Sequence, residues 1–283
     1  MIELGPNRYG KSAIRLVKVV REPASHRVRD LTVAVTLEGD FGAAHADGDN
    51  RLVIATDTMK NTVYAMAPEH LTGAIEAFGR VVAEHFVAFP QVSRATVTIR
   101  EHHWAPIPTD GGPARDAFLR LGDLTRLALV TAERDGSPTF QAGIEDLTVM
   151  KTAKSAFAGF PRDRYTTLPE TGDRIMATRV SAAWRYGSTD LDWDAVFDGV
   201  KATLLDVLAD HVSPSVQSSI WLMGRAILER HAPVEEIRMV LPNLHHWPVD
   251  LGPFGIENRG EIFVPTSEPH GLIEATVRRS DGR

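Results

Sequence analysis

The chain has 283 residues, of which 31 are basic and 37 acidic, and it contains no cysteine. At roughly 150 residues per domain, this length predicts two domains or one large one. A formal net charge of −6 does not provide the basic surface with which proteins bind nucleic acid or anionic lipid, so we expect neither as a partner. Without cysteine, disulfides, thiolate nucleophiles and cysteine-bound metal centres are excluded.

The N-terminal segment lacks the charged start and apolar run of a secretion signal. No stretch approaches the roughly 18 apolar residues of a membrane-spanning helix. We therefore expect a cytoplasmic protein without a membrane partner.

Hydrophobic periodicity predicts the elements of the first half. Apolar alternation and β-branched residues predict strands over residues 12–20, 31–37, 95–104 and 127–132. Apolar residues at steps of three and four predict an amphipathic helix over 68–89, and residues 56–66 precede it as a shorter helix.

The second half repeats this order. Strands are predicted over 174–184, 236–247 and 272–277, and helices over 196–208 and 214–230. The segment Glu101-His102-His103-Trp104 is echoed half a chain later by Leu244-His245-His246-Trp247, which suggests duplication of a β-β-α-α-β-β unit. We predict an α+β fold in which each half is an antiparallel sheet with helices on one face. The turn at Asp135-Gly136-Ser137-Pro138 places the domains at 1–138 and 139–283.

One segment matches the sequence pattern of a phosphate-binding loop but lacks its structural context. Residues 5–12 match G-x-x-x-x-G-K-[ST], a loop that holds phosphate between a buried strand and a helix. Only four residues precede Gly5, and a strand is predicted after Ser12. The context therefore excludes a nucleotide-binding loop.

The paired histidines allow two interpretations. Adjacent side chains on a strand point to opposite faces, so only one histidine of each pair can address a given site. A metal ion would need further ligands from elsewhere, and no H-E-x-x-H motif occurs. A packed or hydrogen-bonded structural role is expected for one histidine, while the other remains a candidate proton carrier.

Other polar residues also have structural explanations. Lys11 is either a solvated lysine or, next to apolar neighbours, a base. Thr56 and Asp57 fit helix caps, and Pro214 suits a first helical position. The Val216 amide, in a first helical turn, would be available to a ligand. Residues 157–174 form a loop with aromatic anchors, in which an arginine with a surface salt bridge is the ordinary expectation.

Together these segments resemble the urate oxidase (uricase) family. The matching stretches run from near residue 9 to near residue 278 and comprise Tyr9-Gly10-Lys11, residues 49–64, residues 157–174, Ser215-Val216-Gln217, residues 241–245 and residues 269–273. The resemblance implies two tandem tunnelling-fold (T-fold) domains and a homotetramer with active sites where subunits meet. It also implies oxidation of urate by molecular oxygen without metal or organic cofactor, giving 5-hydroxyisourate and hydrogen peroxide.

The resemblance also assigns roles. Lys11, Thr56 and His245 match the catalytic relay, in which neutral Lys11 draws a proton through the threonine hydroxyl. The residues that match the substrate site are Thr56, Asp57, Phe157, Arg174, Val216, Gln217 and Asn243. Phe157 would stack on the purine, Arg174 and Gln217 would bind its edge, Asn243 would face oxygen or water, and Val216 and Asp57 would bind through backbone amides.

Two rival functions remain for the same fold. One is a zinc-dependent enzyme that converts pterins or purines, which the absence of cysteine disfavours. The other is a protein that binds a purine without catalysis. Oxygen uptake on addition of urate and a test for required zinc distinguish these from a urate oxidase.

Overall fold

The computed structural model describes residues 2–280. The chain forms two compact units. The first comprises the residues up to Gly143 together with Arg185–Ala195, and the second comprises Ile144–Trp184 and the residues from Val196 onward. The domain boundary after residue 138 stays a prediction.

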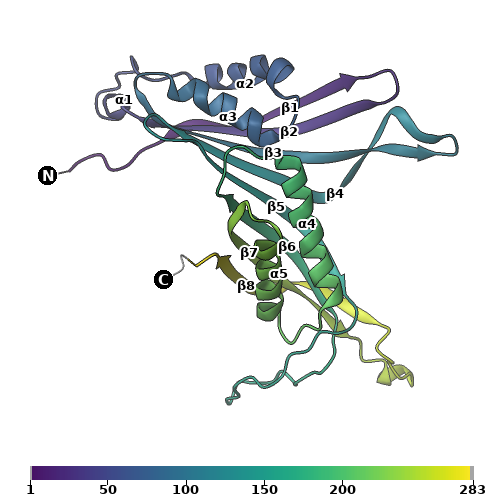
Figure 1. Cartoon of the computed structure of the whole chain (residues 1–283). Helices are drawn as coiled ribbons and strands as arrows, with labels where there is room; N and C mark the ends of the chain where they lie inside the picture. The colour runs from purple at the N-terminus through teal and green to yellow at the C-terminus, as the bar shows by residue number, and fades with distance from the viewer. Residues whose placement is uncertain (1, 281–283) are drawn as a thin grey trace. The chain divides into compact units, whose positions relative to one another are not determined.

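Four antiparallel strands form the sheet of the first unit. They are β1 (Tyr9–Arg21), β2 (His26–Gly39), β3 (Val92–Thr109) and β4 (Gly112–Glu133), and neighbours in the sheet are consecutive in the chain. The helices between β2 and β3 are α1 (Gly42–Ala46), α2 (Thr56–His70) and α3 (Ile75–Val87). Helix α2 packs against β1, and α3 packs against β3 and β4 (Figure 1). The four strands predicted for this half are confirmed.

The core of this unit lies between the sheet and these helices. Every second residue of the central part of β2 is fully buried, namely Leu31, Val33, Val35 and Leu37. This is the alternation of a strand with one covered face. Burial of each of these side chains contributes roughly 1.5–3 kcal/mol to the stability of the fold. Strand β2 is therefore firmly held in the core, and it supports its neighbour β1, against which α2 packs.

The single helix predicted over 68–89 is wrong. Pro68 lies in the last turn of α2, the helix ends before Leu71, and α3 begins only at residue 75. Leu71 fits the apolar spacing because it is buried rather than helical, and Gly73 in the connection is typical of a helix end. Lys18 of β1 donates hydrogen bonds to three carbonyl groups at this end, including that of Leu71 at 2.9 Å.

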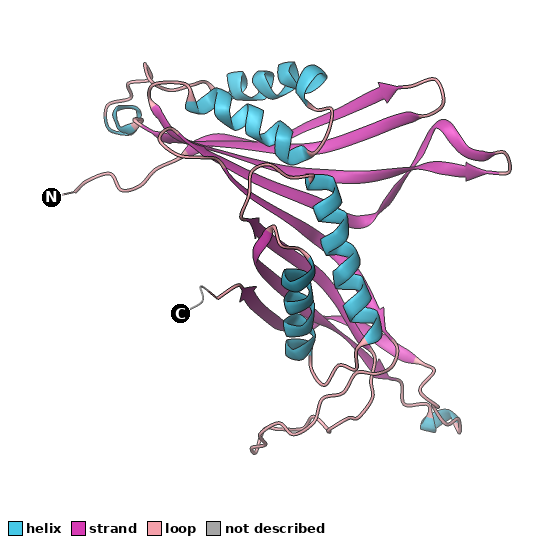
Figure 2. Ribbon diagram, in the orientation of Figure 1, coloured by secondary structure: helices cyan, strands magenta, loops and turns pink. Residues whose placement is uncertain are grey.

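The second unit follows the predicted β-β-α-α-β-β order. Its elements are β5 (Thr139–Lys151, shared with the first unit), β6 (Met176–Tyr186), α4 (Trp193–Asp210), α5 (Val216–Arg230), β7 (Val234–Pro248), a short 3-10 helix (Gly252–Phe254) and β8 (Phe263–Arg278). Strands β7 and β8 pair antiparallel, and α5 packs against both. Figure 2 shows α5 lying along these strands. The α+β architecture is as predicted, although β5 was not foreseen. Among residues 2–280, every helix is too short or too polar to span a bilayer.

Candidate functional site

Lys11 lies on β1 beside a β-bulge. Lys11 and Ile14 pair with residues of β2 that are only two apart, so one residue of β1 is extra, and Ala13 has a positive φ of 55°. Regular alternation would place Lys11 and Ile14 on opposite faces. The extra residue returns them to the same face, so half-buried Lys11 lies on the side where Ile14 enters the core.

Thr56 is the first residue of α2, and Asp57 is the second. The preceding residue, Ala55, is extended, and no side chain caps this helix start. The capping role that the residue types allowed for Thr56 and Asp57 is therefore wrong. The N–H groups of the first turn have no partner inside the helix, so they are available to a ligand.

The carboxylate of Asp57 is already occupied. It accepts hydrogen bonds from the ammonium of Lys60 and, at 2.9 Å, from the side-chain amide of Asn61. The Lys60 hydrogen bond lowers the pKa of Asp57, and the nearby charge of Lys11 adds a smaller effect in the same direction. Lys11, Thr56 and Asp57 therefore lie together at the start of α2, where Asp57 offers a ligand its backbone amide.

A cavity of about 530 Å³ lies in the second unit. Three of the predicted site residues line it: Arg174 before β6, and Asn243 and His245 on β7. The remaining lining residues are Thr152, Leu168, Pro169, Thr171, Asp173, Ile175, His246, Trp247, Pro248, Gly260 and Phe263.

Arg174 is half-buried and has no carboxylate partner among residues 2–280. Its guanidinium carbon lies 5.3 Å from the centre of the Phe157 ring, and its buried Nε has no hydrogen-bond partner there. Burial lowers the pKa of Arg174, yet arginine keeps its charge in proteins. The ordinary surface salt bridge expected in this loop is therefore wrong for Arg174. A cation beside an aromatic face, with donors unused, suits a flat anionic ligand.

A short backbone frame holds the loop of Phe157 in place. Phe157 exchanges two backbone hydrogen bonds with Thr171, at 2.9 and 3.0 Å, and the amide of Arg174 donates to the carbonyl of Ser155 at 2.7 Å. The amide of Ala156 donates to the carbonyl of Ser213, also at 2.7 Å. Phe157, Arg174 and the start of α5 are thus fixed to one another. No periodicity in the sequence signals this frame.

The start of α5 is capped by Ser215, whose side chain accepts a hydrogen bond of 3.2 Å from the amide of Ser218. Val216 is the first helical residue, so the expectation that Pro214 would hold this position is wrong. Val216 is 3% exposed, whereas Gln217 is exposed. Their amides belong to the turn that has no acceptors inside the helix, which makes this a second terminus able to bind an anion.

His245 stacks on Trp247, with ring centres 5.2 Å apart and planes 22° from parallel. Burial lowers the pKa of His245 below its ordinary value of 6.5, and the charges of Arg174 and His270 lower it further. His245 is therefore neutral near pH 7 and able to accept a proton.

Both members of this histidine pair line the cavity. The pairing of β7 with β8 shifts between Asn243 and His245 but is regular from His245 to Pro248, so the expectation that the two side chains point to opposite faces stays a prediction. His246 is hydrogen-bonded through Nδ1 to the carbonyl of Leu244 at 3.1 Å, a structural role of the kind expected. Within residues 2–280, no three histidine or acidic side chains are grouped to hold a metal ion.

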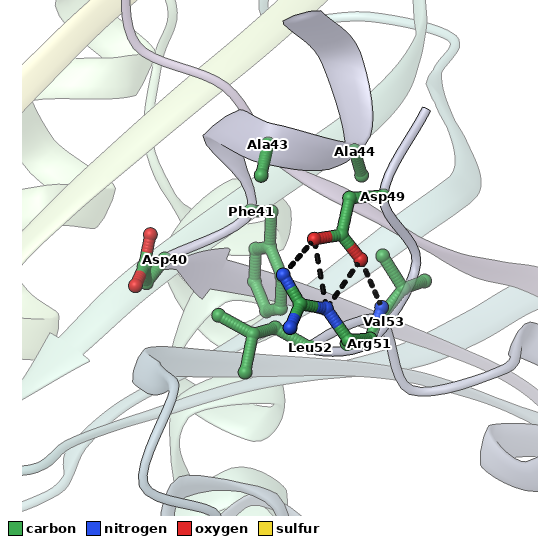
Figure 3. Close-up of a pocket in the computed structure, with 8 residues that line it drawn as sticks. All are labelled: Asp40, Phe41, Ala43, Ala44, Asp49, Arg51, Leu52 and Val53. Carbon is green, nitrogen blue, oxygen red and sulfur yellow. Dashed lines mark hydrogen bonds and ion pairs between the residues drawn. The ribbon is translucent and has the colours of Figure 1, made fainter. Parts of the chain in front are cut away.

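A second concavity, of about 350 Å³, lies in the first unit before α2 (Figure 3). Asp49 binds Arg51 there through carboxylate–guanidinium hydrogen bonds, and its Oδ1 also accepts from the Arg51 amide at 3.1 Å. The side chain of Arg51 is 88% exposed, and none of the predicted site residues lines this concavity. The amide of Val53 donates a hydrogen bond of 3.0 Å to the carbonyl of Asn50, which forms the turn that leads into α2.

The comparisons with known proteins agree with one another. A sequence model of the family described as "Uricase" matches residues 7–131 and 140–274. A uricase of Arthrobacter globiformis is 45% identical over all of this chain and 92% of its own length, and one of Dictyostelium discoideum is 38% identical over the full length of both. The crystal structure of the Arthrobacter globiformis uricase superposes with a TM-score of 0.94 at 44% identity, over 100% of this chain and 97% of that one. With a family match over most of its residues and full-length relatives of this identity, the chain belongs to the uricase family.

Proposed function

We propose that this protein oxidises urate with molecular oxygen and water to 5-hydroxyisourate and hydrogen peroxide, without a metal or organic cofactor. Family membership supports urate as the substrate. The observation that carries the site assignment is the half-buried guanidinium of Arg174, which lies beside Phe157 without a carboxylate partner in the described chain. An enzyme that binds an anionic purine needs such an unpaired cation.

Urate binding uses three kinds of group. The ring of Phe157 provides the aromatic face, while Arg174 and the Gln217 amide provide donors and an acceptor for the polar edge of the purine. The backbone amides of Val216 and Asp57 add two helix N-termini, whose dipoles favour a negative charge. The Phe157 ring selects a flat molecule, whereas Arg174 and the two helix N-termini favour an anion over a neutral base.

Proton removal involves Lys11, Thr56 and His245. A threonine hydroxyl is too weak a base alone, so Lys11 takes the proton through Thr56, and neutral His245 assists its transfer. The resulting electron-rich dianion passes electrons to oxygen, which Asn243 faces above the ring. Oxygen leaves as peroxide, and water supplies the hydroxyl of the product.

The assembly is proposed to be a homotetramer with active sites at subunit interfaces. Lys11, Thr56 and Asp57 belong to the first unit, whereas Phe157, Arg174, Val216, Gln217, Asn243 and His245 belong to the second. A site shared between subunits would combine the two groups. The cytoplasmic location stays a prediction from the sequence.

The test follows urate absorbance, oxygen uptake and peroxide release together in metal-free buffer. A urate oxidase consumes one oxygen and releases one peroxide per urate, and chelation leaves the rate unchanged. Activity that is lost on chelation and restored by zinc would favour the zinc-dependent rival. Binding of urate without oxygen uptake would leave only a purine-binding protein.

A further inference from the structure

The hydroxyl of Tyr9 forms two hydrogen bonds with a single residue. It accepts from the amide of Ile54 at 2.8 Å and donates to the carbonyl of the same residue at 3.1 Å. The Tyr9 ring packs edge-on against Phe41, with centres 4.7 Å apart. Burial raises the pKa of Tyr9, so the phenol keeps the proton that it donates.

These contacts join the two segments that carry the proposed proton relay. Tyr9 lies two residues before Lys11 on β1, and Ile54 lies two residues before Thr56 at the start of α2. Residues two apart on a strand point to the same face, so Tyr9 and Lys11 both face the helix. Two opposed hydrogen bonds to one residue restrict both the distance and the orientation of the joined segments.

We propose that Tyr9 is a positioning residue for urate oxidation, and that its hydroxyl sets the separation of Lys11 from Thr56. This inference rests on the proposed function, because it needs Lys11 and Thr56 to act as the relay. Proton transfer between such groups requires heavy atoms within hydrogen-bond reach, and a displacement of about 1 Å can cost roughly 100-fold in rate.

The chain contains a matched control for this contact. Tyr64 of α2 donates a hydrogen bond of 3.2 Å to the carbonyl of Arg15 on β1, farther from Lys11. It joins the same helix to the same strand, but the residue is 41% exposed and its hydroxyl bonds to Arg15 rather than to a residue next to the relay. Tyr64→Phe therefore tests attachment of α2 to β1 without changing its start.

The experiment compares Tyr9→Phe with Tyr64→Phe as full-length proteins. The turnover number is measured by peroxide release per site, with sites counted by titration with a non-reactive urate analogue. We expect Tyr9→Phe to lower kcat by about 10- to 100-fold while KM for urate stays within about twofold. Tyr64→Phe should keep the parent kcat. A parent-like kcat in Tyr9→Phe would overturn the proposal, as would an equal loss in both variants.

A double mutant separates positioning from stability. If Tyr9 acts through Lys11, Tyr9→Phe has no further effect on the residual rate of Lys11→Met; a multiplicative loss would contradict this route. If Lys11→Met itself keeps normal turnover, the assignment of Lys11 as the catalytic base is wrong, and the proposed function fails with it. If Lys11→Met is inactive but Tyr9→Phe is normal, only the present inference fails.

A second variant covers the case in which Tyr9→Phe does not fold. Phe41→Leu keeps the Tyr9 hydroxyl but removes the ring that holds the tyrosine in position, so the hydroxyl no longer fixes the separation as firmly. It should lower kcat in the same direction, with KM again unchanged. An unchanged kcat in this variant would also count against the proposal.

Discussion

Replacing Arg174 by alanine should separate urate binding from folding stability. In most buried sites, removal of an arginine leaves a carboxylate without its partner, and both properties suffer. Arg174 has no such partner among the described residues, and its Nε lacks a hydrogen bond. We therefore expect Arg174→Ala to weaken urate binding strongly and to change the free energy of unfolding little.

The magnitudes follow from these contacts. Loss of a charged hydrogen bond to urate costs about 1.5–3 kcal/mol, which is roughly a 10- to 150-fold rise in KM. In the free enzyme, the variant loses a contact with Phe157 at 5.3 Å, worth about 0.5–1 kcal/mol. It also relieves an unsatisfied donor, whose burial costs about 1–3 kcal/mol. The two terms oppose each other, so the melting temperature should stay equal or rise slightly.

Arg126→Ala is the matched contrast. Arg126 Nη2 lies 2.8 Å from the carboxylate of Glu76, whose side chain is fully buried. Removal of this partner leaves a buried charge and should cost about 3–5 kcal/mol.

The assay combines the KM for urate, the Kd of a non-reactive analogue by calorimetry, and denaturant unfolding of both variants. An unchanged KM for Arg174→Ala would refute its role in urate binding. Equal destabilisation of the two variants would refute the argument that Arg174 is unpaired.

Three further predictions concern the first unit and the histidine. Lys11→Met should reduce turnover to a small residual rate while it preserves analogue binding, and near-normal peroxide release would contradict its assignment as base. Ala13→Gly should raise the free energy of unfolding by about 1 kcal/mol in urea titration, because Ala13 has φ 55° and the left-handed conformation costs non-glycine residues about 1–2 kcal/mol; a loss of stability would contradict this. Burial lowers the pKa of His245 in the folded protein below 6.5, so just below pH 6.5 the unfolded chain binds more protons than the folded chain, and the free energy of unfolding falls as the pH drops from 6.5 to the pKa of the folded state. His245→Asn should make the free energy of unfolding depend less steeply on pH in this interval. An unchanged pH dependence would assign the effect to other groups.

The strands could be predicted where one face of a sheet is buried and the other is not. Residues 31–37 show this alternation clearly, since every second side chain is fully buried. Strand β5 was missed because its burial does not alternate throughout: residues 142–144 are buried in succession, and Asp146 adopts a positive φ of 62°. Tertiary packing on both sides of such a strand removes the period that sequence analysis depends on.

The identity of the site residues came from resemblance, whereas their interactions depend on the fold. Two acidic residues, Glu170 and Asp173, precede Arg174 closely in the sequence, so a salt bridge was the natural expectation. The neighbouring acids are instead used by backbone amides: Asp173 accepts from Ser155 at 3.3 Å, and Glu170 accepts from Gly159 at 3.1 Å. The spacing of residues along the chain does not show which donor a carboxylate binds in the folded protein. The lack of a carboxylate partner for Arg174 could therefore not be predicted.

The orientation of Lys11 depends on the same kind of information. Neither residue between Lys11 and Ile14 is a glycine, so the sequence does not indicate a bulge and predicts a regular strand. In a regular strand, Lys11 would point away from the core face of Ile14. With the bulge, β1 contacts both ends of α2: Tyr9 holds the segment before its first turn, and Lys18 binds the carbonyl groups of its last turn. Lys11 lies between these two attachments. Its distance from the helix start is therefore fixed by contacts of its neighbours on the strand, which is why a tyrosine outside the proposed relay should control the rate of proton transfer.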